Sequence, residues 1–433
     1  MILSADALIY GGLVDSRTHT FTQTVLDWRL KRLENLRQNH PDTPLYVFAT
    51  IMRSPRGSEG GMEPAYFEQY AADIFALAAL QDKALVSGLT DAEQQTMATI
   101  RERIPSSHIK DWLERRQKNL AVNAKLIELT KQHKIDYLVL GRDDTSLYSR
   151  STQETRTLMA LAAGLSAEQF GSFPGADQLG MIMLTRAYNK FLGQRPAVAV
   201  LYPQGAGAFT LPNYEDQRIG PTINAHIVAA GGTVTDDAHT ADLVLAVNTP
   251  LTGRTAEAGT FRNVAYVTTG KRHFVTVIAQ HLQAGQKVAL ADITFANGAD
   301  KALMKELSER QLLDKLTAYA GWNTASNALG YALGQGIMAA SMSDQERKNL
   351  LAVRYLDDWA YQADIRQQLY REIVYPAAAS SVDLKDLEPD ITAALNRKLQ
   401  LFNTRYLWLP PNTIDAYFPW NRLFEISVNL VGS

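Results

Sequence analysis

Two adjacent carboxylates beside a guanidinium are the clearest chemical feature of this sequence. The apolar run Tyr137–Gly141 predicts a buried strand, and Arg142, Asp143 and Asp144 follow it directly. In α/β proteins, chemistry is placed at the carboxyl ends of the strands. Of two paired carboxyls, one can stay ionised while its neighbour, its pKa raised by like charge, serves as a general acid. We therefore expect Asp143 and Asp144 to be catalytic, in a reaction such as hydrolysis of a glycosidic bond.

The same residues allow other interpretations. Asp144 could simply cap a following helix. Arg142 favours two ionised acids, which would suit a divalent cation such as magnesium, held by Asp143, Asp144 or Asp292 in a metal-dependent lyase or hydrolase. A third alternative is a non-catalytic protein that binds an anionic small molecule through three arginines, Arg17, Arg53 and Arg142.

Polar residues also follow the other predicted strands or lie close to them. One strand leads into the loop Ser54–Pro64, which contains Glu59 and Glu63. Because a parallel sheet or barrel brings its strand ends to one face, we expect these polar residues to line a single concave site. Trp322 could stack on a sugar ring there, or belong to the core. The residues expected to bind substrate are Arg17, Arg53, Arg142, Glu154, Tyr214, Glu215, Asp216, Asn248, Asp292, Asn297, Asp300, Trp322, Asn323 and Asn327.

Strand-like apolar runs alternate with helix-length segments, which predicts an α/β fold with a parallel sheet. The predicted strands are Ala7–Leu13, Leu45–Ile51, Tyr137–Gly141, Ala197–Tyr202, Leu243–Asn248, Val288–Ile293 and Thr317–Gly321. Seven strands fit a (β/α) barrel-like sheet that is incomplete at its N-terminus, or a doubly wound open sheet. The pattern becomes helical near residue 343, so we expect an α/β domain over 1–342 and a C-terminal helical extension over 343–433 that packs on it.

The composition narrows the possible partners. The 433 residues carry 43 Lys and Arg against 45 Asp and Glu and show no long basic run, so nucleic acid and membrane surfaces are not expected partners. The chain has no cysteine, no signal peptide and no apolar run of about 20 residues, which favours a cytoplasmic protein. None of its eight histidines has ligand spacing on a helix. We expect a sugar-like small molecule as substrate and no cofactor, with magnesium as the open exception.

Several stretches together resemble a bacterial family known only as domain of unknown function 4127. They are ADALIYGGLVDSR, GRDDTSLYSRSTQE, GADQLGMIMLTRA, NYEDQ, VNTP, ADITFANGAD, YAGWNTASNALG and FPWNRLFEI, spread over nearly the whole chain. Members of that family usually begin earlier, with a strand that leads into an Asp-Asp-Arg-Pro motif, so the resemblance implies that an N-terminal segment is missing here. Gln178 stands where the family has Glu.

A fainter likeness points to a reaction. Adjacent aspartates after a strand, followed much later by Trp-Asn and Asn, are similar to retaining β-N-acetylglucosaminidases that use the acetamido group of the substrate. This likeness implies that Asp143 orients the acetamido group and Asp144 protonates the leaving oxygen, while Asn323 and Asn327 bind the sugar. Likeness of this kind does not by itself establish function.

Overall fold

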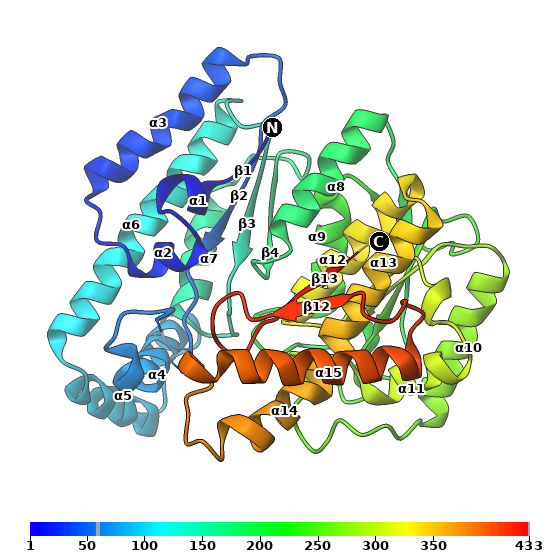
Figure 1. Ribbon diagram of the computed structural model, residues 1–433. Coiled ribbons are helices and arrows are strands. Elements are labelled where there is room, and N and C mark those ends of the chain that lie inside the picture. The colour runs from blue at the N-terminus through cyan, green and yellow to red at the C-terminus, as the bar shows by residue number, and fades with distance from the viewer. Residues whose placement is uncertain (58–60, 432–433) are drawn as a thin grey trace. The chain divides into compact units, whose positions relative to one another are not determined.

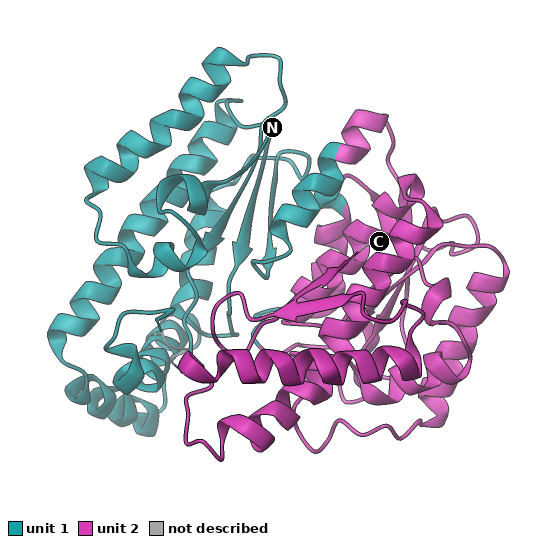
Figure 2. Ribbon diagram, in the orientation of Figure 1, with its two compact units in different colours: residues 1–187, 214–217, 228–230 teal, residues 188–213, 218–227, 231–433 magenta. Residues whose placement is uncertain are grey.

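The computed structural model describes residues 1–57 and 61–431. The chain forms two compact units (Figure 2). Unit 1 consists of Met1–Ala187, Tyr214–Gln217 and Val228–Ala230, and unit 2 consists of Tyr188–Asn213, Arg218–Ile227 and Gly231–Ser433. The predicted boundary near residue 342 stays a prediction, and the helices that follow it belong to unit 2.

Unit 1 contains an open four-stranded parallel sheet in the order β1-β2-β3-β4 (Figure 1). Its strands are β1 (Ile2–Ser4), β2 (Tyr46–Ile51), β3 (Tyr137–Arg142) and β4 (Phe170–Pro174). The register pairs Ile51 of β2 with Arg142 of β3, and Arg142 with Pro174 of β4, so these strands end together. The helices in this part of the chain are α1 (Ala5–Ile9), α2 (Leu13–Thr18), α3 (Gln23–Asn39), α4 (Phe67–Val86), α5 (Asp91–Arg103), α6 (Ser106–Lys131), α7 (Arg150–Leu161) and α8 (Leu179–Leu192), the last of which continues into unit 2.

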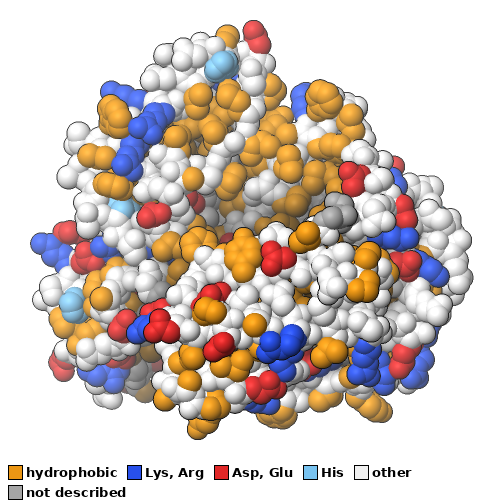
Figure 3. Space-filling view, in the orientation of Figure 1, with side chains coloured by type: hydrophobic (Ala, Val, Ile, Leu, Met, Phe, Trp, Pro, Cys, Tyr) orange, Lys and Arg blue, Asp and Glu red, His pale blue; other side chains and the backbone are white. Residues whose placement is uncertain are grey.

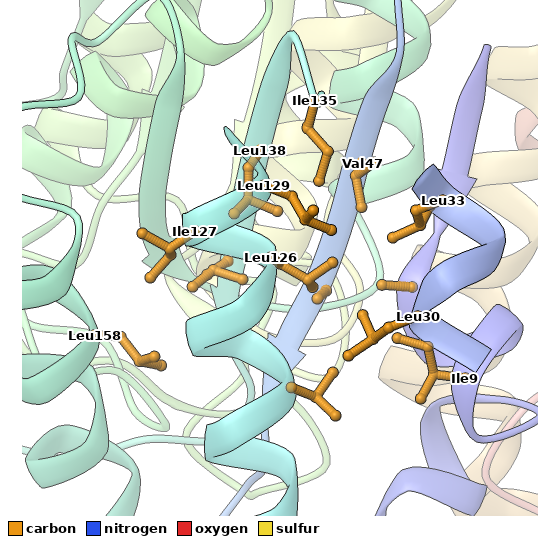
Figure 4. Packing of buried hydrophobic residues seen from close by; sticks show 14 of the residues in the cluster. Ile9, Leu30, Leu33, Val47, Leu126, Ile127, Leu129, Ile135, Leu138 and Leu158 are labelled. Atoms are coloured by element: carbon orange, nitrogen blue, oxygen red, sulfur yellow. The ribbon is translucent and has the colours of Figure 1, made fainter. Parts of the chain in front are cut away.

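Helices α3 and α6 supply much of the core of unit 1. Leu30 and Leu33 of α3 and Leu126 of α6 are buried in one cluster with Val47 of β2 and Leu138 of β3 (Figure 4). All six residues of β3 are buried, as expected for a central parallel strand that is covered on both faces. This packing fixes the strand whose end carries Asp143 and Asp144.

Unit 2 contains an open five-stranded parallel sheet in the order β11-β9-β7-β5-β6. Its strands are β5 (Ala197–Leu201), β6 (Thr233–Thr235), β7 (Leu243–Asn248), β9 (Val288–Asp292) and β11 (Ala318–Ala320). Two small strand pairs accompany it, the parallel β8 (Ala256–Glu257) with β10 (Phe295–Ala296) and the antiparallel β12 (Ile414–Tyr417) with β13 (Ser427–Leu430).

The helices of the second half of the chain include an uncommon π-helix over Tyr355–Ile365. The α-helices are α9 (Ile219–Ala229), α10 (Thr269–Gln283), α11 (Lys301–Glu309), α12 (Ala325–Met338), α13 (Asp344–Arg354), α14 (Arg366–Leu369) and α15 (Glu388–Tyr406). Figure 3 shows acidic and basic side chains interspersed over the surface where α15 lies. Lys398 of α15 pairs with Glu372 at 2.9 Å. No helix in the described part of the chain is long and apolar enough to cross a membrane.

The predicted α/β class with parallel sheets is confirmed, but the barrel is not, because both sheets are open. The strand predicted at Ala7–Leu13 is wrong. The strand lies earlier, at Ile2–Ser4, and the Ser4 side chain accepts a hydrogen bond from the Ala7 N–H at 3.2 Å, which caps helix α1. Of that stretch, Ile9 and Tyr10 pack into the core of unit 1 at the end of α1, and Leu13 begins α2.

Candidate functional site

Asp143 and Asp144 lie just beyond the carboxyl end of β3, and each binds an arginine. Arg17 of α2 donates from Nη2 to Oδ2 of Asp143 at 2.6 Å, and Arg53, two residues after β2, donates from Nη1 to Oδ2 of Asp144 at 2.9 Å. Asp143 and both arginines are buried, whereas 26% of the Asp144 side chain is exposed. Asp144 is therefore the aspartate that solvent reaches more easily.

Glu63 joins the two arginines. Arg53 donates from Nε to Oε1 of Glu63 at 2.6 Å, and Nη1 of Arg17 lies 3.7 Å from the same oxygen. Glu63 was noted in the sequence only as a polar residue of the loop after β2, and Glu59 of the same loop lies outside the described residues. The structure thus brings Arg17, Arg53, Asp143, Asp144 and Glu63 into one buried ionic cluster.

A second segment of unit 1, Tyr214–Gln217, meets the end of β3. The Thr145 N–H donates to the Tyr214 carbonyl at 2.8 Å, and Nη2 of Arg142 lies 3.3 Å from Oδ1 of Asp216. Burial raises the pKa of Asp216, although the Arg142 charge opposes the shift, and burial lowers the pKa of Arg142. Tyr214 is 41% exposed, while Glu215 is buried.

Glu154 has a positioning role. It accepts two hydrogen bonds from the fully buried Arg116 of α6, at 2.8 and 2.7 Å. Arg116 also donates to the carbonyls of Met52 and Arg53, at 2.7 and 2.8 Å. Arg116 therefore fixes the backbone that carries Arg53, and Glu154 holds Arg116 in place.

Asp6 is a further acidic residue of this region that the sequence did not indicate. Its Oδ2 accepts hydrogen bonds from the Thr50 N–H at 3.0 Å and the Thr50 hydroxyl at 2.9 Å. Burial raises the pKa of Asp6 to about 7; the bonds from Thr50 oppose this shift, and the charge of Asp143 adds to it. Asp6 thus holds a proton over part of the neutral range, close to carboxylates that are paired with arginines.

Buried guanidinium N–H groups remain unpaired in this cluster. Nε and Nη1 of Arg17 and Nε of Arg142 have no hydrogen-bond partner. Arg17, Arg53 and Arg142 face four carboxylates, Glu63, Asp143, Asp144 and Asp216, so the cluster carries no excess of positive charge. A buried donor that stays unpaired costs about 1–3 kcal/mol, unless a ligand or water accepts its hydrogen bond.

The backbone at Asp144 and Tyr214 is strained. Their φ angles are +32° and +65°, in the left-handed region that side-chain-bearing residues seldom adopt. Conformations of this kind cost about 1–3 kcal/mol and cluster at functional sites. Both strained residues are the exposed members of the group, so the strain falls where a ligand would make contact.

The remaining predicted residues belong to unit 2. Asn248 ends β7 and Asp292 ends β9, and Nδ2 of Asn248 donates to Oδ1 of Asp292 at 2.7 Å. Asp300 caps α11, its N–H donates to Asp292 at 2.7 Å, and Lys271 lies 2.8 Å from its Oδ2. Burial and the charge of Asp300 raise the pKa of Asp292 to about 7. Burial also disfavours the ionised form of Asp300, but the Lys271 charge outweighs this and its pKa is lowered.

The other four residues of unit 2 follow β10 and β11. The Asn297 N–H donates to the Asn323 carbonyl at 3.0 Å, and both residues have positive φ angles, +60° and +66°. Trp322 is partly exposed, so it is neither a fully buried core residue nor a free surface ring. Asn327 is buried in the first turn of α12.

The sixteen predicted site residues therefore fall on two separate units. Unit 1 holds Arg17, Arg53, Arg142, Asp143, Asp144, Glu154, Tyr214, Glu215 and Asp216, and unit 2 holds Asn248, Asp292, Asn297, Asp300, Trp322, Asn323 and Asn327. In the described ranges 1–57 and 61–431, no three His, Asp or Glu side chains form a group that could hold a metal ion.

Comparison with known protein families shows the family to which the chain belongs. The family described as "Protein of unknown function (DUF4127)" matches residues 1–429. The chain belongs to this family. No curated protein and no solved structure matches this DUF4127 protein. Gln178, which stands where the resemblance implies Glu, is buried in unit 1 and donates to the Pro174 carbonyl at 3.0 Å.

Proposed function

We propose that the carboxyl end of the unit 1 sheet binds a sugar-like small molecule, and that the protein hydrolyses glycosidic bonds in carbohydrate or amino-sugar derivatives. The observation that carries the proposal is the buried cluster of arginines and carboxylates around Asp143 and Asp144, with its unpaired guanidinium N–H groups. A neutral, hydroxyl-rich ligand suits such a cluster, because it can accept from the spare donors without bringing a charge of its own.

The charge balance weighs against an anionic ligand. Four carboxylates surround the three arginines, so an anion would gain little from them and would face the carboxylates at close range. Binding of a sugar is therefore the better-supported alternative. A metal-dependent reaction finds no specific support, since Asp143 and Asp144 already accept from guanidinium groups and Asp292 belongs to unit 2.

Asp144 is the residue that we assign to the reacting bond. It is the more exposed carboxylate, and its pairing with Arg53 suits it to attack the sugar carbon, in place of the proton donation that the likeness to β-N-acetylglucosaminidases implies for it. Asp143, held by Arg17, positions the substrate. Asp6, whose pKa is about 7, is the candidate source of the proton that the leaving oxygen receives.

The test is turnover of a chromogenic amino-sugar glycoside by the wild-type protein and by Asp144→Asn. We expect the variant to lose activity by at least about a hundredfold, the usual value of a positioned acid–base group. Asp73→Asn, on an exposed pair with Arg103 in α4 and α5, is the matched control and should keep full activity. Unchanged turnover in Asp144→Asn, with circular dichroism identical to wild type, contradicts the assignment.

Two further measurements separate the alternatives. If inorganic phosphate raises the melting temperature and a neutral sugar does not, the result would favour the alternative of a protein that binds an anionic small molecule. Activity that disappears on chelation and returns with magnesium would favour the metal-dependent enzyme. A cytoplasmic location, and the absence of nucleic-acid and membrane partners, stay predictions from the composition.

A further inference from the structure

Unit 2 has its own group of polar side chains with unpaired buried atoms, and they converge on Phe424. Trp322 packs against the Phe424 ring with centroids 6.0 Å apart, and the guanidinium of Arg366 lies 5.1 Å from the same centroid. Gln362 donates from Nε2 to the Phe424 carbonyl at 3.1 Å. Three side chains thus surround one aromatic residue: Trp322 follows β11, and Gln362 and Arg366 lie one turn apart in the helical stretch that begins at Tyr355.

Each of these three side chains presents a buried atom with no hydrogen-bond partner. The unpaired atoms are Nε1 of Trp322, Nη1 of Arg366 and Oε1 of Gln362. Gln362 is 0% exposed. Two donors and one acceptor around one ring are a costly arrangement if nothing occupies them, since each unpaired buried group costs about 1–3 kcal/mol.

The backbone near Trp322 contains two residues in the left-handed conformation and a glycine in close contact with the π-helix. Trp322 and Asn323 follow β11 after Gly321, at the carboxyl end of the sheet. Asn297 and Asn323 both have left-handed backbone conformations and are joined by a backbone hydrogen bond. Gly298, which follows Asn297, packs on the π-helix that carries Gln362. A Cβ on Gly298 would lie 3.1 Å from the Ala363 nitrogen. Strained backbone and π-helical turns are both frequent at functional sites.

We infer that unit 2 contains a second ligand site, formed by Trp322, Gln362 and Arg366 around Phe424, which takes a neutral saccharide ring. A saccharide hydroxyl or amide can accept from Trp322 Nε1 and Arg366 Nη1 and donate to Gln362 Oε1. The partly exposed indole offers an apolar face for the ring. This site is assigned from unit 2 alone and does not depend on the unit 1 proposal.

The charges around Arg366 favour a neutral ligand over an anionic one. Burial lowers the pKa of Arg366, and the nearby acids Glu257, Asp357 and Glu425 oppose this shift. Asp357 also pairs with Arg354 and Glu425 with Arg422, so acids and guanidinium groups balance here and an incoming anion meets no excess of positive charge. A carboxylate ligand would also leave Oε1 of Gln362 without a donor.

Binding of N-acetylglucosamine, measured by titration calorimetry and ligand-observed NMR, tests the site. Trp322→Phe keeps the ring and removes the N–H, and Arg366→Lys keeps the charge and removes the planar donor pair. We expect each variant to bind about tenfold more weakly than wild type, as the loss of one buried hydrogen bond implies. Trp28→Phe, at a tryptophan that is 60% exposed in α3, is the control and should bind like wild type.

The outcomes separate this site from the one in unit 1. Weakened binding in Trp322→Phe and Arg366→Lys, with normal binding in Trp28→Phe, supports a site in unit 2. Wild-type affinity in Trp322→Phe, or no binding of N-acetylglucosamine by the wild-type protein, overturns it. Glucuronate binding more tightly than N-acetylglucosamine overturns the neutral-ligand assignment. Loss of glycoside turnover in Asp144→Asn bears only on the proposed function.

Discussion

Asp6 and Thr50 are joined by two hydrogen bonds to one carboxylate oxygen, from the Thr50 N–H at 3.0 Å and the Thr50 hydroxyl at 2.9 Å. Asn123 of α6 donates to the Thr50 carbonyl at 3.0 Å, so both sides of this β2 residue are held by buried side chains. The pairing fixes helix α1 to the strand that leads to Arg53. It also places a carboxyl with a pKa of about 7 beside the ionic cluster of unit 1.

Asp6→Asn should change how stability depends on pH. Between pH 3.8, the ordinary pKa of an aspartate, and about pH 7, folded Asp6 holds a proton that the unfolded chain has released. The free energy of unfolding therefore falls as pH rises through this window, by up to about 1.4 kcal/mol per pH unit. The asparagine variant should lack this contribution. Urea unfolding at several pH values measures it, with the exposed Asp42→Asn as control, and identical pH dependence in wild type and Asp6→Asn would refute the assignment.

Arg17→Met should destabilise the fold strongly. Arg17 and Asp143 are both buried and 2.6 Å apart, and removal of one partner from a buried pair leaves an uncompensated charge at a cost of about 3–5 kcal/mol. The double variant Arg17→Met with Asp143→Asn should cost less than the sum of the single changes, which a double-mutant cycle by urea unfolding will show. Arg103→Met, in a pair whose arginine is 55% exposed, should cost less than about 1 kcal/mol. Additive costs for Arg17 and Asp143 would mean that the pair contributes no coupling.

The sequence predicted the central strands well because their burial leaves a continuous apolar run. Tyr137–Gly141 and Leu243–Asn248 agree with β3 and β7 to within one residue. Strand β4 was missed because FGSFP contains Gly, Ser and Pro, which indicate a turn, and β6 because it has only three residues. The number of sheets could not be predicted, since strand pairing depends on contacts distant in sequence.

The site was predictable where polar residues follow strands and not where they lie within helices. Arg53 and Asp143 were found because each comes just after an apolar run. Arg116 was missed because an arginine within a long helix normally faces solvent. A signal for it did exist: Trp112, Arg116 and Asn123 lie four and seven residues apart on one face of α6, and all three are buried. A polar stripe beside a tryptophan on one helix face indicates a buried polar network.

Gly141→Ala should destabilise unit 1 although alanine suits a strand better than glycine does. A Cβ at Gly141 would lie 2.4 Å from the Gly175 carbonyl oxygen and 2.6 Å from Cδ1 of Leu179. The carbonyl belongs to the backbone and cannot turn away, so we expect a cost of about 1–3 kcal/mol. Gly180→Ala, in α8, is the control, because its Cβ would meet only Phe48, at 3.7 Å. This substitution should stabilise the protein by up to about 1 kcal/mol. Equal stability of wild type and Gly141→Ala in urea would contradict the close packing of β3.

Lys271→Met should raise the pKa of Asp300 and destabilise unit 2. Lys271 lies 2.8 Å from Asp300 Oδ2 and donates to Asn248. Burial by itself would raise the pKa of Asp300, and the charge of Lys271 is the main cause that lowers it. Without Lys271, Asp300 is still buried and still repelled by Asp292, but it has lost the cation that compensates both effects. We therefore expect the free energy of unfolding to fall by about 3–5 kcal/mol near neutral pH. Because folding lowers the pKa of Asp300, its ionised form stabilises the fold at pH values above 3.8, the pKa in the unfolded chain. This contribution should vanish in the variant. Carboxyl ¹³C titration and urea unfolding measure both effects, and Arg272→Met, 57% exposed, should leave both nearly unchanged.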